Sequence, residues 1–249
     1  MAVITVANQK GGVGKTTLAY NLVHTLAEHG RRVLAVDNDP QGNLTEIFLA
    51  DGRDMAPGAD VAGFYKGRQV QPQEIAPGID LIGADIGLAT LEEGFEMVFR
   101  LREGLADLSR SYDYIVIDAL PSLGPLQVAS LAAATYLLIP SKPARWSARG
   151  LTDLLEAVEK VRRRINPEIR VLGVLLNLLD TKKLSIERAL EEALREQYKD
   201  MIFKSRLCKR AAMDEATALG LPITKYPGAG PALVEWEAAF EEIMGGMEK

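Results

Sequence analysis

The chain is poor in the side chains that build disulfides and metal centres. It contains one cysteine, Cys208, and two histidines among 249 residues. One cysteine cannot form an internal disulfide, and such sparing use is typical of proteins from the reducing cytosol. The same scarcity offers little for a structural zinc site. We therefore expect a cytoplasmic protein without such a site.

Long apolar segments are also missing. No apolar run approaches the about 18 residues that a membrane-spanning helix requires. Only Met1 and Ala2 precede the first strand-like run, so we expect no signal peptide. No composition shift, repeat or low-complexity run divides the sequence. These observations predict a single domain over residues 1–249.

An excess of positive charge is absent as well, because the formal net charge is −5. This balance argues against a uniformly basic surface for nucleic acid. Basic residues are nevertheless concentrated in one region: residues 182–210 contain nine Lys or Arg and five Asp or Glu. Residues 201–210 contain four basic and no acidic side chains. Any contact with nucleic acid is expected to be local to this region.

Apolar strand-like runs alternate with helical patterns along the chain. The predicted strands are Val3–Ala7, Arg32–Asp37, Asp80–Gly83, Tyr114–Asp118, Tyr136–Pro140 and Arg170–Asn177. The predicted helices are 15–29, 91–109, 124–134, 147–165, 184–198, 210–219 and 231–244, and Ala50–Gln73 is expected to form loops or short helices. This alternation predicts an α/β fold with a mostly parallel twisted sheet and helices on both faces. Ligands then bind at the carboxyl ends of the strands.

A glycine-rich segment between the first strand and the first helix is the strongest functional signal. Glycines let several backbone N–H groups point at phosphate oxygens, and the following helix adds its partial positive charge. A lysine and a threonine at the end of the loop are suited to the β/γ-phosphates and to Mg²⁺. The predicted nucleotide-binding residues are Lys10, Gly11, Gly12, Val13, Gly14, Lys15, Thr16 and Thr17.

One position departs from the general phosphate-binding loop. Gln9 occupies the place of the first glycine, and Lys10 follows it at the sharp turn. The loop resembles the deviant Walker A motif of the ParA/MinD/nitrogenase-iron-protein group of P-loop ATPases. The resemblance implies ATP as the nucleotide. It also implies an ATP-dependent homodimer in which Lys10 reaches the nucleotide of the partner subunit.

The second strand ends in two carboxylates, Asp37 and Asp39, within the run Asp-Asn-Asp-Pro-Gln-Gly-Asn. Carboxylates beside a triphosphate are costly unless they bind a metal ion or water. The run is similar to the family's Asp-x-Asp-Pro-Gln-Gly-Asn segment, which implies that Asp39 orients or activates the attacking water. Asp37 would support the metal shell. An ordinary strand-ending turn would also be rich in Asp and Asn.

A later strand, Tyr114–Asp118, ends in an acid and fits the Walker B pattern. Its carboxylate would hold Mg²⁺ through water. The following switch segment resembles that of the family, except that Leu120 replaces a proline. The predicted metal-binding residues are Thr16, Asp37, Asp39 and Asp118, and the predicted catalytic residues are Lys10, Lys15 and Asp39.

The resemblance extends to the C-terminal third of the chain. It implies that Asn177 contacts the base, although an ordinary strand-to-loop asparagine is the alternative. It also implies nonspecific contacts with phosphates of double-stranded DNA, although a solvated basic face would have the same composition. The predicted DNA-binding residues are Lys182, Lys183, Lys204, Arg206, Lys209 and Arg210.

These signals favour a DNA-partitioning ATPase that positions a plasmid, a chromosome or another cargo. A ParB-like or other adaptor protein would stimulate its hydrolysis, which would be slow without that partner. The short N-terminus leaves no room for an additional helix-turn-helix domain, so we expect no operator-specific binding.

Two alternatives remain. The first is a MinD-like ATPase that binds membranes through its last helix, where Leu233, Trp236, Phe240 and Ile243 share one face. The opposite face carries several glutamates that anionic lipid would repel, so we expect core packing and no membrane partner. The second is a metabolic P-loop enzyme on the same scaffold. One cysteine excludes the cluster ligands of an iron-protein electron carrier.

Overall fold

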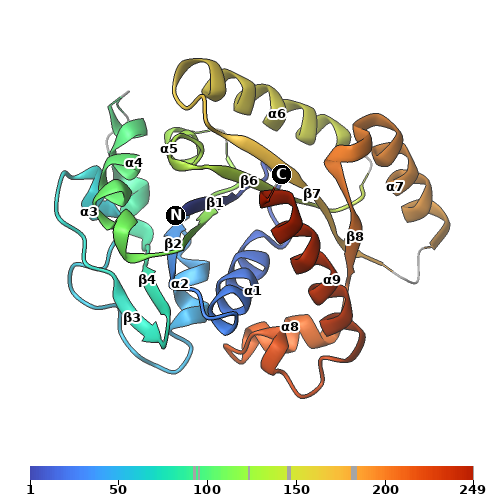
Figure 1. Cartoon of the computed structure of the whole chain (residues 1–249), viewed down its shortest axis with the longest axis horizontal. Coiled ribbons are helices and arrows are strands. Elements are labelled where there is room, and N and C mark those ends of the chain that lie inside the picture. Colours follow the sequence, from blue (N-terminus) through green and yellow to red (C-terminus); the bar gives the residue numbers. More distant parts are fainter. Residues whose placement is uncertain (92–93, 95, 123, 145–146, 181–183, 249) are drawn as a thin grey trace.

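The computed structural model describes residues 1–91, 94, 96–122, 124–144, 147–180 and 184–248. A twisted sheet lies between two layers of helices (Figure 1). The strands are β1 Ala2–Val6, β2 Val33–Asn38, β3 Gln73–Ala76, β4 Ile79–Ile82, β5 Tyr114–Ala119, β6 Tyr136–Ser141, β7 Arg170–Leu179 and β8 Ile202–Cys208. The α-helices are α1 Lys15–Glu28, α2 Asn43–Phe48, α3 Ala62–Tyr65, α4 Met97–Leu108, α5 Pro125–Ala133, α6 Ser147–Arg164, α7 Leu184–Tyr198, α8 Ala211–Ala218 and α9 Gly230–Met247.

The strand order in the sheet is β3-β4-β2-β5-β1-β6-β7-β8. Every neighbouring pair is parallel except β3 and β4, which form an antiparallel edge. The first strand, β1, therefore lies near the middle, between β5 and β6. Since the central strands run in one direction, the carboxyl ends of β1, β2 and β5 meet at the same edge of the sheet.

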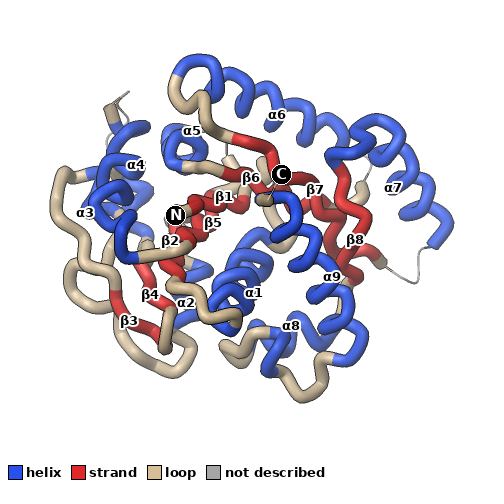
Figure 2. The backbone as a smooth tube through the Cα atoms, in the orientation of Figure 1, coloured by secondary structure: helices blue, strands red, loops and turns tan. Residues whose placement is uncertain are grey.

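The central strands are buried on both faces, which explains their continuous apolar sequences. Alternate side chains point to opposite sides, so neighbouring residues such as Leu137 and Leu138 enter different cores. One layer contains α1, α2, α8 and α9, with Trp236 fully buried at its centre. The other contains α3, α4 and α5 beside β2 and β5, and α6 and α7 beside β6, β7 and β8 (Figures 1 and 2).

The predicted fold class is confirmed: the chain is a single α/β domain built on a mostly parallel sheet. Each predicted strand is present, with ends shifted by at most two residues. The helix expected over 91–109 begins only at Met97. A 3₁₀ turn over residues 86–90 precedes this region. The stretch from Ala50 to Gln73 contains the short helix α3, as the prediction of loops or short helices allows.

Two edge strands, β3 and β8, were not predicted. The sequence of β8, Ile-Phe-Lys-Ser-Arg-Leu-Cys, places charges at alternating positions, and its composition suggested a basic segment. An edge strand has one solvent-facing side, so an apolar run is not required there. The carboxylate of Glu242 on α9 accepts hydrogen bonds from the backbone N–H groups of Lys204 and Ser205, both at 2.8 Å. Helix α9 thereby covers part of the exposed edge.

Candidate functional site

The glycine-rich loop connects the carboxyl end of β1 to the start of α1. Gly12 and Gly14 have φ angles of 67° and 82°, in the left-handed region that favours glycine. A Cβ atom on Gly14 would also overlap the side-chain amide of Asn177. The loop conformation therefore requires glycine at position 14 on two grounds.

Asn8 anchors this loop, a role that the sequence analysis missed. Its Nδ2 donates to the carbonyl of Pro140 at 2.7 Å, and its Oδ1 accepts from the backbone N–H of Lys10 at 3.0 Å. The loop is thereby tied to the end of β6. A polar residue directly between a buried strand and a glycine-rich turn was the signal available for it.

Lys15 is the first residue of α1 and is buried. Burial lowers the pKa of its ammonium group, while the charges of Asp118 and Asp39 act in the opposite direction. The first turn of α1, Lys15-Thr16-Thr17-Leu18, contains no acidic residue. The first intrahelical bond runs from the N–H of Leu18 to the carbonyl of Gly14 at 3.0 Å, so the N–H groups of the three residues before it, together with the lysine side chain, are suited to bind an anion.

The side-chain oxygens of Thr16 and Asp118 lie next to each other. The Thr16 hydroxyl donates to Asp118 Oδ2 at 2.6 Å. Asp118 Oδ1 is buried and has no hydrogen-bond partner among the described residues. Burial, followed by the charge of Asp37, raises the pKa of Asp118. A divalent cation would satisfy the free oxygen and stabilise the buried charge, and hard oxygen ligands are those that Mg²⁺ prefers.

Asp37 lies next to Asp118 in the register of β2 and β5, but its oxygens are already used. Its Oδ2 accepts from the N–H and the hydroxyl of Thr45 at 2.9 and 2.8 Å, and its Oδ1 accepts from the N–H of Asp39 at 3.1 Å. Burial raises the pKa of Asp37. These bonds make Asp37 an organiser of the segment from Asp39 to α2, with little left for direct metal coordination.

Asp39 begins the turn after β2 and is buried. Its Oδ1 accepts from the N–H of Gln41 at 3.0 Å, and its backbone carbonyl accepts from the N–H of Gly42 at 2.9 Å. Its charge acts on Lys15, which places the carboxylate near the anion site. Among the described residues, no hydrogen bond to its second oxygen is formed by another side chain.

Lys10 extends away from this centre toward the start of α6. Its Nζ donates to the Ser147 hydroxyl at 3.4 Å, and partial burial lowers the pKa of its ammonium group. The side chain passes close to Gly150 in the first turns of α6. Lys10 and Lys15 are thus close in sequence but contact different groups. Lys10 contacts α6, whereas Lys15 lies near Asp118 and Asp39.

Asn177, at the end of β7, lies directly over the loop. Its Nδ2 donates to the carbonyl of Val13 at 2.8 Å, and the backbone N–H of Leu178 donates to its Oδ1 at 2.8 Å. Leu178 has a φ of 57°, an uncommon conformation for a residue with a side chain. Asn177 also lines a cavity of about 30 Å³ with Thr17 and Arg210, which is room for one or two waters.

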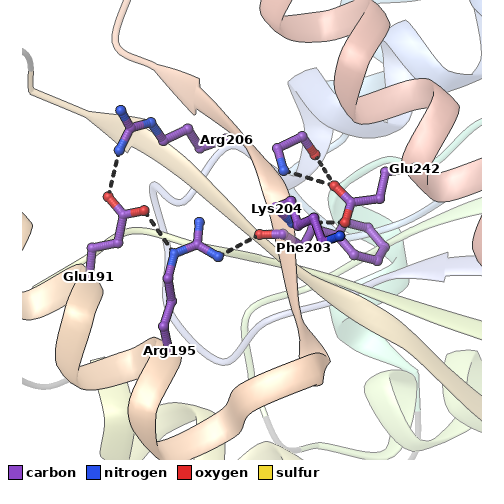
Figure 3. A network of polar contacts seen from close by, with 7 residues as sticks. Glu191, Arg195, Phe203, Lys204, Arg206 and Glu242 are labelled. Carbon is purple, nitrogen blue, oxygen red and sulfur yellow. Dashed lines mark hydrogen bonds and ion pairs between the residues drawn. The ribbon is translucent and has the colours of Figure 1, made fainter.

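The predicted DNA-binding residues fall into three groups. Figure 3 shows two of these residues, Lys204 and Arg206. Lys182 and Lys183 lie outside the described residues. Lys204 and Lys209 are exposed and form no ion pair with described residues. Arg206 forms an ion pair with Glu191 at 2.9 Å, and Arg210 forms one with Glu235 at 2.5 Å. The sequence analysis missed both glutamates, because they lie on helices distant in sequence from β8.

The apolar face of α9 is part of the core. Trp236, Phe240 and Ile243 are buried among side chains of α1 and the sheet. Within the described ranges, no helix combines the length and the apolar character needed to cross a bilayer. The face that the membrane alternative requires is therefore already covered by the protein itself.

Comparison with known proteins agrees with this geometry. The model of a family described as an AAA domain matches residues 1–171. The chain is 35% identical over 254 residues to the sporulation initiation inhibitor protein Soj of Bacillus subtilis, covering 98% of this chain and 99% of that protein. It is 34% identical over 257 residues to the chromosome-partitioning ATPase Soj of Thermus thermophilus, covering 99% and 96%.

Solved structures give the same result. The ATP complex of a variant of McdA from Cyanothece superposes with a TM-score of 0.86 at 25% identity, covering 100% of this chain and 96% of that one. Cobyrinic acid a,c-diamide synthase of Mycobacterium smegmatis, with bound ADP and magnesium, has a TM-score of 0.74 at 30% identity, covering 88% and 91%.

The family resemblance predicted from the loop, the Asp-Pro-Gln-Gly-Asn run and the C-terminal segment is confirmed over nearly the whole chain. This chain belongs to the AAA-domain family that matches it and, within that family, to the ParA/Soj-type partitioning ATPases.

Proposed function

We propose that the protein is an ATP-dependent DNA-partitioning ATPase that binds nonspecific DNA as an ATP-bound dimer and is released when an adaptor protein stimulates hydrolysis. One observation supports the nucleotide chemistry above all others. The left-handed loop at Gly12 and Gly14, the buried Lys15 and the unsatisfied oxygen of Asp118 meet at one edge of the sheet.

The phosphates of ATP would bind the loop N–H groups and Lys15, and Mg²⁺ would be held by Thr16 and Asp118. The metal ion supplies charge neutralisation on the β- and γ-phosphates. The cavity of about 30 Å³ beside Asn177 is too small for a purine. A base that entered this cavity would require Arg210 or Asn177 to shift from its present hydrogen bonds.

Asp39 and Lys10 would carry out the steps specific to this family. Asp39, at the turn after β2, would orient the attacking water. Lys10 would leave Ser147 and reach the nucleotide of the second subunit, where a positive charge acts like an arginine finger. Such a group contributes roughly 10³–10⁵ in rate. If the adaptor controls its placement, turnover by the protein alone is slow.

DNA binding would use the basic segment around β8 and the lysines at positions 182 and 183. These side chains would contact phosphates and read no base sequence. The resulting protein would be associated with the nucleoid in its ATP-bound state and would lie free in the cytoplasm otherwise. Its cargo would be set by the adaptor.

A metabolic enzyme is the second candidate, since the chain is 30% identical to a cobyrinic acid a,c-diamide synthase. That likeness covers 88% of this chain with a TM-score of 0.74. The ATP-bound McdA structure covers 100% with a TM-score of 0.86. The chromosome-partitioning ATPase Soj of Thermus thermophilus is 34% identical and matches 99% of this chain, and this longer match supports the partitioning function.

The test is binding to random-sequence duplex DNA with ATP, with ADP and without nucleotide, over a range of salt concentrations. We expect binding only with ATP, and log K should fall by about 0.9 for each phosphate contact per unit of log salt. Lys15→Ala, which removes the buried loop lysine, is the control that should abolish the ATP dependence. Absence of DNA binding in every nucleotide state, despite nucleotide uptake, would contradict the proposal and favour the metabolic alternative.

A further inference from the structure

We propose that Glu191 is an internal competitor for DNA phosphate, and that its carboxylate limits the DNA affinity of the β8 surface by holding Arg206. The inference rests on the proposed DNA-binding function and goes beyond it. Basic residues alone would be expected to set the affinity of this surface for DNA. The inference gives one acidic side chain, Glu191, a part in setting that affinity.

Glu191 lies on α7 and faces β8, with 9% of its side chain exposed. Its Oε2 accepts from Arg206 Nη1 at 2.9 Å, and its Oε1 accepts from Arg195 Nε at 2.9 Å. Arg195 in turn donates from Nη1 to the carbonyl of Phe203 at 2.9 Å. Figure 3 shows the carboxylate held between the two guanidinium groups. The bond to Arg195 would keep Glu191 in place when a second anion binds Arg206.

Arg206 remains accessible to a phosphate, because 50% of its side chain is exposed. A phosphate that approaches Arg206 finds one of its five N–H donors, on Nη1, engaged by Glu191, and it also meets the negative charge of that carboxylate. Two further acidic residues, Asp180 and Glu187, and one basic residue, Arg188, line the same small cavity as Glu191 and Arg206. The local potential at Arg206 is therefore less positive than its sequence neighbourhood of lysines and arginines indicates.

Two acidic residues of α9 that lie beside β8 are bound to the backbone of the strand. Glu235 accepts from the N–H of Cys208 as well as from Arg210, and Glu242 accepts from two N–H groups of the strand. Among the described residues, Glu191 accepts hydrogen bonds only from side chains. Its charge can therefore be removed without the loss of a strand hydrogen bond, which distinguishes control of DNA binding from support of the fold.

The test is Glu191→Gln in the full-length protein, with ATP and random-sequence duplex DNA. Glutamine keeps the shape and one acceptor oxygen for Arg195 but frees Arg206. We expect about threefold to tenfold tighter binding and a salt slope steeper by up to about 0.9. Glu159→Gln is the matched control. Glu159 also pairs with two arginines, Arg162 and Arg163, but lines a groove at the amino ends of β6 and β7.

DNA affinity is then measured for Arg206→Ala with and without Glu191→Gln. In this background the gain in affinity from Glu191→Gln should disappear. A gain that persists without Arg206, or that Glu159→Gln reproduces, would show a general effect of net charge and overturn the inference. Affinity in Glu191→Gln equal to or below that of the original protein would overturn it too. If neither protein binds DNA with ATP while both bind nucleotide, the proposed function fails together with the inference. Thermal unfolding of each variant verifies that the fold is retained.

Discussion

Two adjacent carboxylates, Asp37 and Asp118, show how hydrogen bonding separates residues of the same type. They are register partners on β2 and β5, and burial raises the pKa of both. Asp37 accepts three hydrogen bonds from Thr45 and Asp39, whereas Asp118 keeps one oxygen without a described partner. The free oxygen makes Asp118 the stronger candidate for Mg²⁺, and the saturated Asp37 is suited to hold the turn that carries Asp39.

Asp39→Ala tests the assignment of the attacking water to this turn. The variant should bind ATP and dimerise but fail to hydrolyse, because Lys15, Thr16 and Asp118 remain in place. Single-turnover hydrolysis and nucleotide titration measure the two properties separately. Asp39→Asn is the conservative companion, since it keeps an acceptor oxygen for the N–H of Gln41. Normal turnover in both variants would move this role to another residue.

His24 provides a prediction about pH. Its side chain is 9% exposed and packs against Tyr20 and Phe48, with ring centroids 4.6 and 5.6 Å away. Burial, followed by the charge of Lys225, lowers the pKa of His24 from 6.5 to about 4. The unfolded chain therefore takes up a proton between these pH values that the folded protein does not. This lowers the free energy of unfolding as pH falls through that window, by about 3 kcal/mol in total.

Urea unfolding at pH 7 and at pH 4, compared between the protein and His24→Phe, isolates this contribution from that of the carboxylates. Phenylalanine keeps an aromatic ring in the cluster but cannot take up a proton. The loss of stability on acidification should be smaller in the variant. An identical loss in the two proteins would show that His24 is protonated in the folded state over the same range.

At the scale of elements, α9 and β8 stabilise each other through carboxylates. Glu235 and Glu242 are seven positions apart, so they lie on the same face of α9, and both accept N–H groups from β8. The parallel edge strand is thereby protected from pairing with another chain. The apolar residues Trp236, Phe240 and Ile243 of the same helix are buried in the core. The same helix therefore protects the edge of the sheet and contributes apolar side chains to one of the two helical layers.

Glu242→Ala should lower the free energy of unfolding by about 1–3 kcal/mol, because two backbone N–H groups and the Ser205 hydroxyl lose their acceptor. Urea unfolding measures the change. Glu241→Ala, at the exposed neighbouring position on α9, should have almost no effect. Equal stabilities for the two variants would show that water replaces the carboxylate without cost.

At the scale of the whole molecule, the position of Lys10 bears on the proposed dimer. In the single chain its ammonium group contacts Ser147 at 3.4 Å, away from Thr16 and Asp118. A residue directed away from its own site has little to do there. Under the proposed function, Lys10 would act on the nucleotide of a second copy of the chain.

Lys10→Ala should leave nucleotide affinity of the monomer nearly unchanged and abolish ATP-dependent dimerisation. Titration with a non-hydrolysable ATP analogue measures the first property, and sedimentation with and without the analogue measures the second. Lys15→Ala is the contrasting variant, since it should lose nucleotide binding itself. A loss of monomer affinity in Lys10→Ala as large as in Lys15→Ala would make Lys10 a ligand of its own nucleotide.

The sequence by itself determined the fold class, the family and the alternation of the central strands and helices along the chain. Buried parallel strands, the glycine loop and the acids at strand ends are local patterns, because each depends on consecutive residues and their spacing. The site residues within these patterns stay predictions, and the geometry around the loop supports them. Edge strands β3 and β8 escaped prediction because a half-exposed strand carries no continuous apolar run.

Only the tertiary structure decided which polar side chains are already engaged. The carboxylates that bind the side chains of Arg206 and Arg210 lie 15 and 25 residues away, on helices α7 and α9. No spacing rule connects such positions, because packing of the helices against the sheet brings them together. The same packing covers the apolar face of α9 and leaves one oxygen of Asp118 without a hydrogen-bond partner among the described residues. Charge and hydropathy along a chain thus indicate which groups are present, and the fold determines which of them remain available to a ligand.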